Sequence, residues 1–284
     1  MIVNLKTMLD TAAQQNCAVG AFNVYNLESV LAVYEAMQEA KCPAIISFGE
    51  SYMKHAPIEA VAACVKALLE DSELTAVLHL DHAKNLSSIK RAIDCGFSSV
   101  MYDGSRLSLT ENIADTQKAV QMAHVKGVSV EGELGYLNEE DGSGEISAQC
   151  TGVDEARQYA QQTGIDALAV AVGNAHGIYF EKPKLHFDQL QKIAQAVPCP
   201  LVLHGSSGIS SADLVRAIDC GVRKFNVNTE ISTTAVAEAR QFLAEHPAVE
   251  NPNLRFEAVL KDARSSMKNK IEEFMQVFSR KSLK

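Results

Sequence analysis

Short apolar runs alternate along the chain with longer segments in which apolar residues recur every three or four positions. The short runs have the length of buried strands, and the spacing in the longer segments is that of a helix with one apolar face. Leu190, Ile193 and Val197, for example, fall on one side of a predicted helix. Eight strands are predicted in this way, at residues 18–24, 44–48, 76–80, 98–102, 129–134, 167–172, 201–203 and 224–227.

Local signals support this alternation of strands and helices. Asn85 and Thr151 stand where helix N-caps are expected, and the pentapeptide Ala-Ile-Asp-Cys-Gly at 92–96 returns at 217–221, each time between a helix and a strand. Eight strand–helix units predict an α/β fold, a (β/α)8 TIM barrel, with an open doubly wound sheet as the second candidate. We expect a single domain over residues 1–284, with a C-terminal helical extension from about 245 that packs on the barrel or on a second subunit.

Composition narrows the class of protein. The 284 residues carry a formal net charge of −9 without a basic run, so the electrostatic footprint of a nucleic-acid-binding protein is missing. The seven cysteines stand singly, which argues against a disulfide framework or a thiolate zinc site. No apolar run has the length of a membrane span and the amino terminus does not resemble a signal peptide. We therefore expect a cytoplasmic protein, free of membrane and nucleic acid, that acts on small molecules.

Three predicted strands run into a histidine at their carboxyl ends. His82 follows the third strand, His176 the sixth and His204 the seventh, and Asp81 precedes the first of these. A closed barrel brings these three strand ends to one rim, where such folds place their chemistry. Three neutral imidazoles leave a bound Zn²⁺ one open position, the arrangement of a catalytic site. His79, three residues before His82 on the same strand, faces the other side by the strand's period of two and is expected to pack or to support a ligand.

Small and polar residues follow the last two strands. Gly205-Ser206-Ser207-Gly208 follows the seventh strand, and residues 226–229 (Asn-Val-Asn-Thr) end the eighth. Barrels commonly bind phosphate at this place, through backbone N–H groups and a helix start. The same residues would also suit an ordinary turn into a helix capped by Ser210 or Ser211. A zinc site beside a phosphate site points to a phosphorylated carbonyl compound as the substrate.

The sequence resembles the class II, zinc-dependent fructose- and tagatose-bisphosphate aldolase family over nearly its whole length. The resemblance rests on seven ordered blocks, at 22–24 (FNV), 80–82 (LDH), 103–105 (DGS), 130–135 (VEGELG), 173–177 (GNAHG), 203–208 (LHGSSG) and 226–230 (NVNTE). It implies zinc on His82, His176 and His204, with Asp81 as the acid or base that transfers a proton. It also implies that Gly177, Gly205, Ser206, Ser207, Asn226, Val227, Asn228 and Thr229 bind the dihydroxyacetone phosphate half. A monovalent cation, Na⁺ or K⁺, and a homodimer or homotetramer belong to the same expectation.

The residues suit that chemistry. Cleavage of a ketose 1,6-bisphosphate, fructose or tagatose, gives dihydroxyacetone phosphate and glyceraldehyde 3-phosphate through an enediolate that zinc stabilises as a Lewis acid. Asp81 would take the proton from the C4 hydroxyl, and Glu140, in the acidic loop at 139–142, would exchange the proton on the enediolate carbon. Glu131 and Glu133 are expected to support the zinc histidines.

Two departures from the family pattern concern the far end of the substrate. Ala83-Lys84 follows the Asp-His pair, where relatives usually have glycine, and Arg106 follows Asp-Gly-Ser, where they often have histidine. An arginine at that place could contact a distal anion. The sequence therefore leaves open an aldolase for another ketose 1-phosphate with a distal anion.

Three alternative functions are considered for a barrel with these residues. A barrel metallohydrolase would need a His-x-His pair, which the sequence lacks, and a Schiff-base aldolase would need a lysine in the sixth strand, which has none. A non-catalytic barrel subunit that only binds a sugar phosphate is the non-enzymatic alternative.

Overall fold

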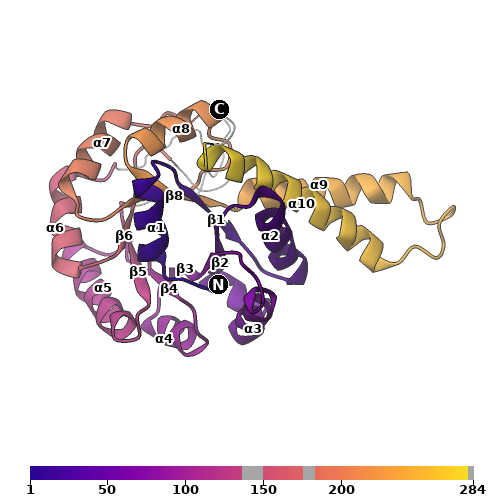
Figure 1. Ribbon diagram of the computed structural model, residues 1–284, viewed down its shortest axis with the longest axis horizontal. Coiled ribbons are helices and arrows are strands. Elements are labelled where there is room, and N and C mark those ends of the chain that lie inside the picture. Colours follow the sequence, from indigo (N-terminus) through magenta and orange to yellow (C-terminus); the bar gives the residue numbers. More distant parts are fainter. Residues whose placement is uncertain (136–149, 175–182, 281–284) are drawn as a thin grey trace.

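The computed structural model describes residues 1–135, 150–174 and 183–280, and shows the predicted closed barrel. Eight parallel strands pair in sequence order, and the last pairs with the first (Figure 1). The (β/α)8 fold is confirmed. The strands are β1 (Val19–Asn23), β2 (Ala44–Gly49), β3 (Ala76–Ala83), β4 (Ser99–Tyr102), β5 (Ser129–Leu134), β6 (Ala167–Val170), β7 (Leu201–Leu203) and β8 (Val222–Val227).

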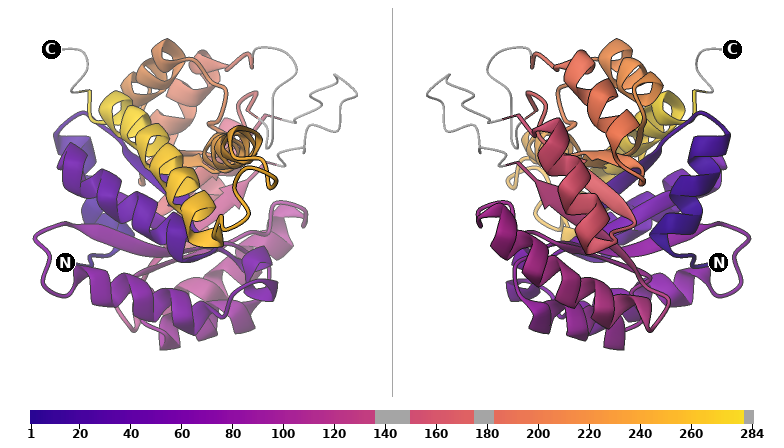
Figure 2. Two further views of the ribbon diagram at one scale, coloured as in Figure 1. Left: turned by 90° about the vertical axis from the view of Figure 1, so that its right-hand side faces the viewer. Right: turned by 90° about the vertical axis from the view of Figure 1, so that its left-hand side faces the viewer.

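Helices surround the barrel on the outside, as Figure 2 shows from two sides. Their apolar faces pack on the outward residues of the strands in one continuous core, which is the burial that their 3.6-residue spacing predicts. They are α2 (Leu27–Ala40), α3 (Ile58–Leu69), α4 (Leu86–Asp94), α5 (Leu109–His124), α6 (Val153–Thr163), α7 (Phe187–Ala196), α8 (Ser211–Asp219), α9 (Thr229–Glu245) and α10 (Phe256–Phe278). The short 3-10 helix η1 (Glu50–Lys54), which follows β2, has no fully buried residue.

One helix, α1 (Leu5–Gln14), closes the amino end of the barrel. It contacts β3, β5 and β8, and its apolar side packs on the inward residues of the strands. Leu5 and Leu9 are fully buried there, against Val19, Ile45 and Val77 among others. The amino half of the barrel interior is therefore a second, apolar core, and the barrel can open only at its carboxyl end.

Helix ends follow the expected rules, with one correction. Asn85 is the N-cap residue of α4, as predicted. Thr151 is not an N-cap, because α6 begins after Gly152. The Thr151 hydroxyl instead donates to the carbonyl of Leu134 (2.6 Å) and accepts from the N–H of Ala171 (2.9 Å), so that it ties β5 to the segment after β6.

The C-terminal helices α9 and α10 form a hairpin that extends beyond the ring of helices in Figure 1. The end of α10 returns to the barrel, where the ring of Phe278 stacks on that of Phe225 in β8, with centroids 4.6 Å apart. In the described residues no helix is both long enough and apolar enough to span a membrane.

Candidate active site

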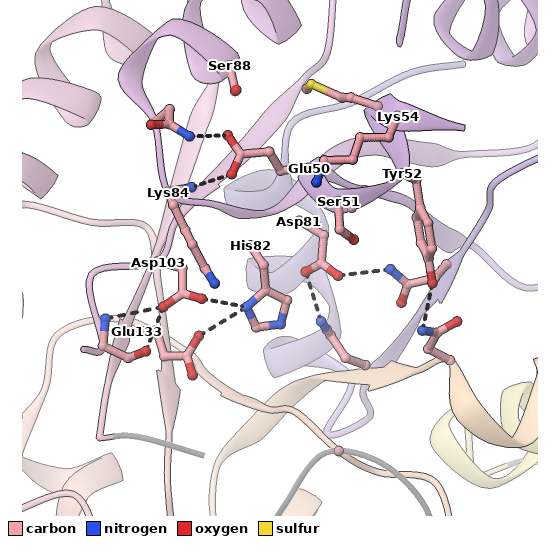
Figure 3. A pocket seen from close by; sticks show the side chains of 18 of the residues that line it. Glu50, Ser51, Tyr52, Lys54, Asp81, His82, Lys84, Ser88, Asp103 and Glu133 are labelled. Atoms are coloured by element: carbon pink, nitrogen blue, oxygen red, sulfur yellow. Dashed lines mark hydrogen bonds and ion pairs between the residues drawn. The ribbon is translucent and has the colours of Figure 1, made fainter. Parts of the chain in front are cut away.

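A cavity of about 710 Å³ opens at the carboxyl end of the barrel (Figure 3). Side chains from almost every part of the rim enter it, because the carboxyl ends of parallel strands converge there. They include Asn23 from β1, Tyr52 and Lys54 from η1, Asp81 and His82 from β3, Asp103 after β4, Glu133 from β5, Ser207 after β7 and Asn226 from β8.

A β-bulge lets Asp81 and His82, which are neighbours in sequence, face the same cavity. Successive side chains of a regular strand point to opposite faces. Here β3 continues to Ala83 rather than ending at residue 80, and it advances three residues from Leu80 to Ala83 while β4 advances two. His82 takes a φ of 49°, in the left-handed region, at this extra residue. The bulge turns the imidazole beside the carboxylate, and both line the cavity.

His82 and His204 meet nitrogen to nitrogen. Nε2 of His82 lies 3.0 Å from Nδ1 of His204, and the rings are nearly perpendicular. Ligand atoms of Asp81, His82 and His204 all lie within 4.8 Å of one another. Two strand ends that are far apart in sequence thus aim imidazole nitrogens at one point, as a metal ligand pair would.

Carboxylates hold the far side of each imidazole. Asp103 Oδ2 lies 3.0 Å and Glu133 Oε2 3.4 Å from Nδ1 of His82. Glu131 Oε1 lies 2.8 Å from Nε2 of His204. Such partners orient metal-binding histidines and fix their tautomers. Although burial opposes it, the charges of Asp81, Asp103 and Glu133 raise the pKa of His82 well above its ordinary value.

Asp81 is held by two asparagine amides. Nδ2 of Asn23 donates to Oδ2 (2.9 Å), and Nδ2 of Asn226 donates to Oδ1 (3.1 Å). Burial alone would raise the pKa of Asp81, but the positive charges of His82 and Lys224 hold it well below the usual range. The carboxylate is therefore ionised, held in one orientation and placed at the cavity wall.

The buried charges fit a divalent cation. Asp81, Glu131 and Glu133 are at most 3% exposed, and in the described residues Lys224 is the one buried lysine or arginine. Three carboxylates against one ammonium leave two negative charges. A buried carboxylate without a neighbouring positive charge lowers the stability of the fold. Protonation of His82 would supply one of the two missing positive charges. A cation of charge two, held by the facing imidazoles, would complete the balance.

Small residues and a helix start also line the cavity. Gly205, Ser207, Asn228 and Thr229 reach the cavity, and Thr229 is the first residue of α9. The left-handed φ of Gly205, 60°, turns the chain sharply after β7. A helix N-terminus favours an anion at this place. One of its first N–H groups, that of Glu230, donates to Oγ of Ser207 (3.2 Å).

Cationic side chains line the mouth of the same cavity. Lys54 comes from η1, Lys84 from the segment after β3, and Arg106 from the segment after β4. Glu50 accepts from the backbone N–H of Lys84 (3.0 Å) and from Nδ2 of Asn85 (3.2 Å), so both of its carboxylate oxygens bind the loop (Figure 3). In the described part of the chain neither lysine forms an ion pair.

Comparisons with known proteins agree with this geometry. The family model described as fructose-bisphosphate aldolase class-II matches residues 3–282. A relative from Bacillus subtilis, named probable fructose-bisphosphate aldolase, is 37% identical over 96% of this chain and 97% of its own. The chain belongs to the class II fructose-bisphosphate aldolase family.

Two other similar proteins are informative. A protein from Alkalicoccus urumqiensis, named sulfofructosephosphate aldolase, is 35% identical over 96% of this chain and 95% of its own. The crystal structure of the YdjI aldolase from Escherichia coli K12 superposes with a TM-score of 0.85 at 33% identity, over 98% of this chain and 97% of that one. Family membership makes the protein an enzyme of the aldolase class.

Three of the predicted site residues lie outside the described residues: His176, Gly177 and Glu140. Of the predicted phosphate residues, Ser206 and Val227 are fully buried and do not line the cavity. The Ser206 hydroxyl donates to the carbonyl of Leu203 (3.0 Å). Asn226 does line it, but its amide binds Asp81.

Sequence reasoning gave no role to three residues of this region: Asn23, Asp103 and Lys224. Asn23 and Asp103 lie in matching blocks, and each is a polar residue at or just after the end of a strand, which is itself a signal of a site residue. Lys224 went unnoticed because only the sixth strand was searched for a lysine. It lies inside the barrel on β8, 2.7 Å from Glu131, and does not line the cavity. The absence of a lysine from β6 is thus not an absence from the barrel.

Proposed function

We propose that the protein is a divalent-metal-dependent aldolase that cleaves a ketose 1-phosphate with a second anion at its far end. The observation that carries the proposal is that ligand atoms of Asp81, His82 and His204 lie within 4.8 Å of one another, among buried carboxylates that outnumber the buried ammonium of Lys224. Asp81 and His82 line the cavity, and His204 lies fully buried behind them. His82 and His204 would hold the metal, with His176 as the predicted third ligand. Zn²⁺ suits two or three imidazoles with an open position, and when bound it would polarise the substrate carbonyl as a Lewis acid.

Proton transfer falls to Asp81. Both of its oxygens accept amide hydrogen bonds, so the carboxylate keeps one orientation toward the cavity. It would take the proton of the hydroxyl on the carbon that becomes the aldehyde, and return that proton during condensation. The exchange of the proton on the other product stays assigned to Glu140.

The two ends of the cavity would bind the two ends of the substrate. Gly205, Ser207 and the start of α9 suit the phosphate of a dihydroxyacetone phosphate half, beside which the monovalent cation is expected. Lys54, Lys84 and Arg106 suit a second anion. The names of two relatives denote such doubly anionic sugars, a bisphosphate and a phosphate with a sulfo group.

Fructose 1,6-bisphosphate and tagatose 1,6-bisphosphate are the first substrates to test. They differ at C4, whose hydroxyl group Asp81 would face, and the products in both cases are dihydroxyacetone phosphate and glyceraldehyde 3-phosphate. A sulfo or carboxylate group in place of the far phosphate would use the same cationic residues.

A substrate panel tests the proposal. The purified protein is supplied with Zn²⁺ and incubated with the two bisphosphates, a sulfo analogue, and a ketose 1-phosphate with a neutral tail. We expect release of dihydroxyacetone phosphate, with higher kcat/KM for the doubly anionic substrates. Binding of these sugars without any release would support the alternative of a non-catalytic sugar-phosphate-binding barrel.

A further inference from the structure

Among the described residues, the buried ammonium group of Lys224 forms one ion pair, with Glu131. Its Nζ lies 2.7 Å from Oε2 of Glu131, and both side chains are fully buried. The other oxygen of the same carboxylate, Oε1, lies 2.8 Å from Nε2 of His204. Lys224, Glu131 and His204 thus form a linear chain that ends at the imidazole facing His82.

From this chain we infer that Lys224 is a positioning residue for the metal centre, acting through Glu131 on His204. The inference rests on the proposed metal-dependent function. A lysine ammonium only donates hydrogen bonds, and an ionised carboxylate only accepts them. Lys224 therefore fixes one oxygen of Glu131, and the other oxygen must accept from Nε2–H of His204. The proton on Nε2 leaves Nδ1 with its lone pair toward His82, as a metal ligand requires.

Other contacts do not fix Glu131 in the same way. Nε2 of His79 is 3.8 Å from its Oε2, beyond hydrogen-bond range, while Nδ1 of His79 lies 2.8 Å from the hydroxyl of Ser99. In the described residues, Lys224 is therefore the group that holds the Glu131 carboxylate from the side away from His204.

A pair of variants at Glu131 separates positioning from simple charge balance. In Glu131→Gln, Lys224 would attract the amide oxygen and leave the NH₂ group facing His204. Nε2 of His204 would then have to accept, and the proton would move to Nδ1, where it blocks the metal. In Glu131→Gln with Lys224→Met, the amide is free to turn its oxygen to His204 and restore the ligand tautomer.

The measurement is the Zn²⁺ dissociation constant by competition with a chromophoric chelator, with the visible spectrum of bound Co²⁺ as a second readout. Glu131→Gln should weaken Zn²⁺ binding by about 10- to 100-fold, the usual effect of losing such a partner. The double variant should regain most of that loss and the Co²⁺ spectrum of the wild type. Lys224→Met alone should weaken binding by about 10-fold, whereas Lys66→Met, on the exposed side of α3, should not.

The outcomes are distinct. Equal Zn²⁺ affinities of Glu131→Gln and the double variant would overturn the inference, and this comparison holds even if Lys224→Met alone does not fold. A Lys224→Met variant with a lower Tm and unchanged Zn²⁺ affinity would also overturn it, because Lys224 would then only stabilise the fold. A wild type that binds neither metal would instead overturn the proposed function, and the inference with it.

Discussion

The two halves of the barrel interior are built from the same strands and differ sharply in character. On β3 the inward positions are Val77, then His79, then Asp81, and on β1 they run from Val19 and Ala21 to Asn23. Toward the amino end these positions pack against α1 in an apolar core. Two residues further along each strand the same interior is filled with imidazoles, amides and carboxylates.

This difference assigns stability and chemistry to separate places. The amino half buries mainly apolar side chains, which stabilises the fold. The buried hydroxyl of Ser129 is satisfied there, because it accepts from the backbone N–H of Lys6 in α1 (3.1 Å). The carboxyl half buries three carboxylates and holds the backbone of His82 in the left-handed region, which costs stability and persists only because the surrounding structure enforces it. Changes in one half should therefore affect folding, and changes in the other should affect turnover.

The largest effect on turnover is expected at Asp81. Asp81→Ala removes the proton acceptor and should lower kcat by roughly 10²- to 10⁴-fold, the scale of a positioned acid or base. The variant should still bind Zn²⁺, because His82 and His204 remain. Steady-state kinetics with metal analysis checks both points, and near-normal turnover would move the proton transfer to another group.

In the apolar half, a substitution is expected to lower stability and to leave turnover unchanged. Leu9, fully buried in α1, lies at the bottom of the barrel. Leu9→Ala should lower the free energy of unfolding by about 2–5 kcal/mol through the cavity it creates, with kcat and Zn²⁺ affinity of the folded protein unchanged. Denaturant unfolding measures the loss.

The matched control is Leu243→Ala. Leu243 is 50% exposed on α9, so its truncation should change the unfolding free energy by less than about 0.5 kcal/mol. A drop in the turnover of folded Leu9→Ala would show that the two halves are not separate in the way described.

The sequence predicted the strands of the barrel better than the contacts of the site at its carboxyl end. All eight strands were placed to within a few residues, because buried strands between amphipathic helices leave a clear pattern. The bulge at His82 could not be predicted, since an extra residue in a strand leaves no periodic signal. Nor could the partnership of Asn226 with Asp81, which joins residues 145 apart in the chain.

The smallest effect concerns the mouth of the cavity. Arg106→Ala should raise KM for a ketose bisphosphate about 10-fold, the value of one charge-assisted contact, and should leave a ketose 1-phosphate with a neutral tail unaffected. Lys84→Met should behave in the same way, and Lys90→Met, exposed on α4, serves as the control. Equal losses on both substrates would make these side chains structural.

The most direct test of the central claim is a metal titration of the chelator-treated protein, with release of dihydroxyacetone phosphate as the readout. The metal-free protein should be inactive, because the Lewis acid is missing. Activity should return in proportion to added Zn²⁺ and level off at about one equivalent per chain, the content of a single catalytic site. Full activity in protein shown by metal analysis to be free of transition metal would contradict the account.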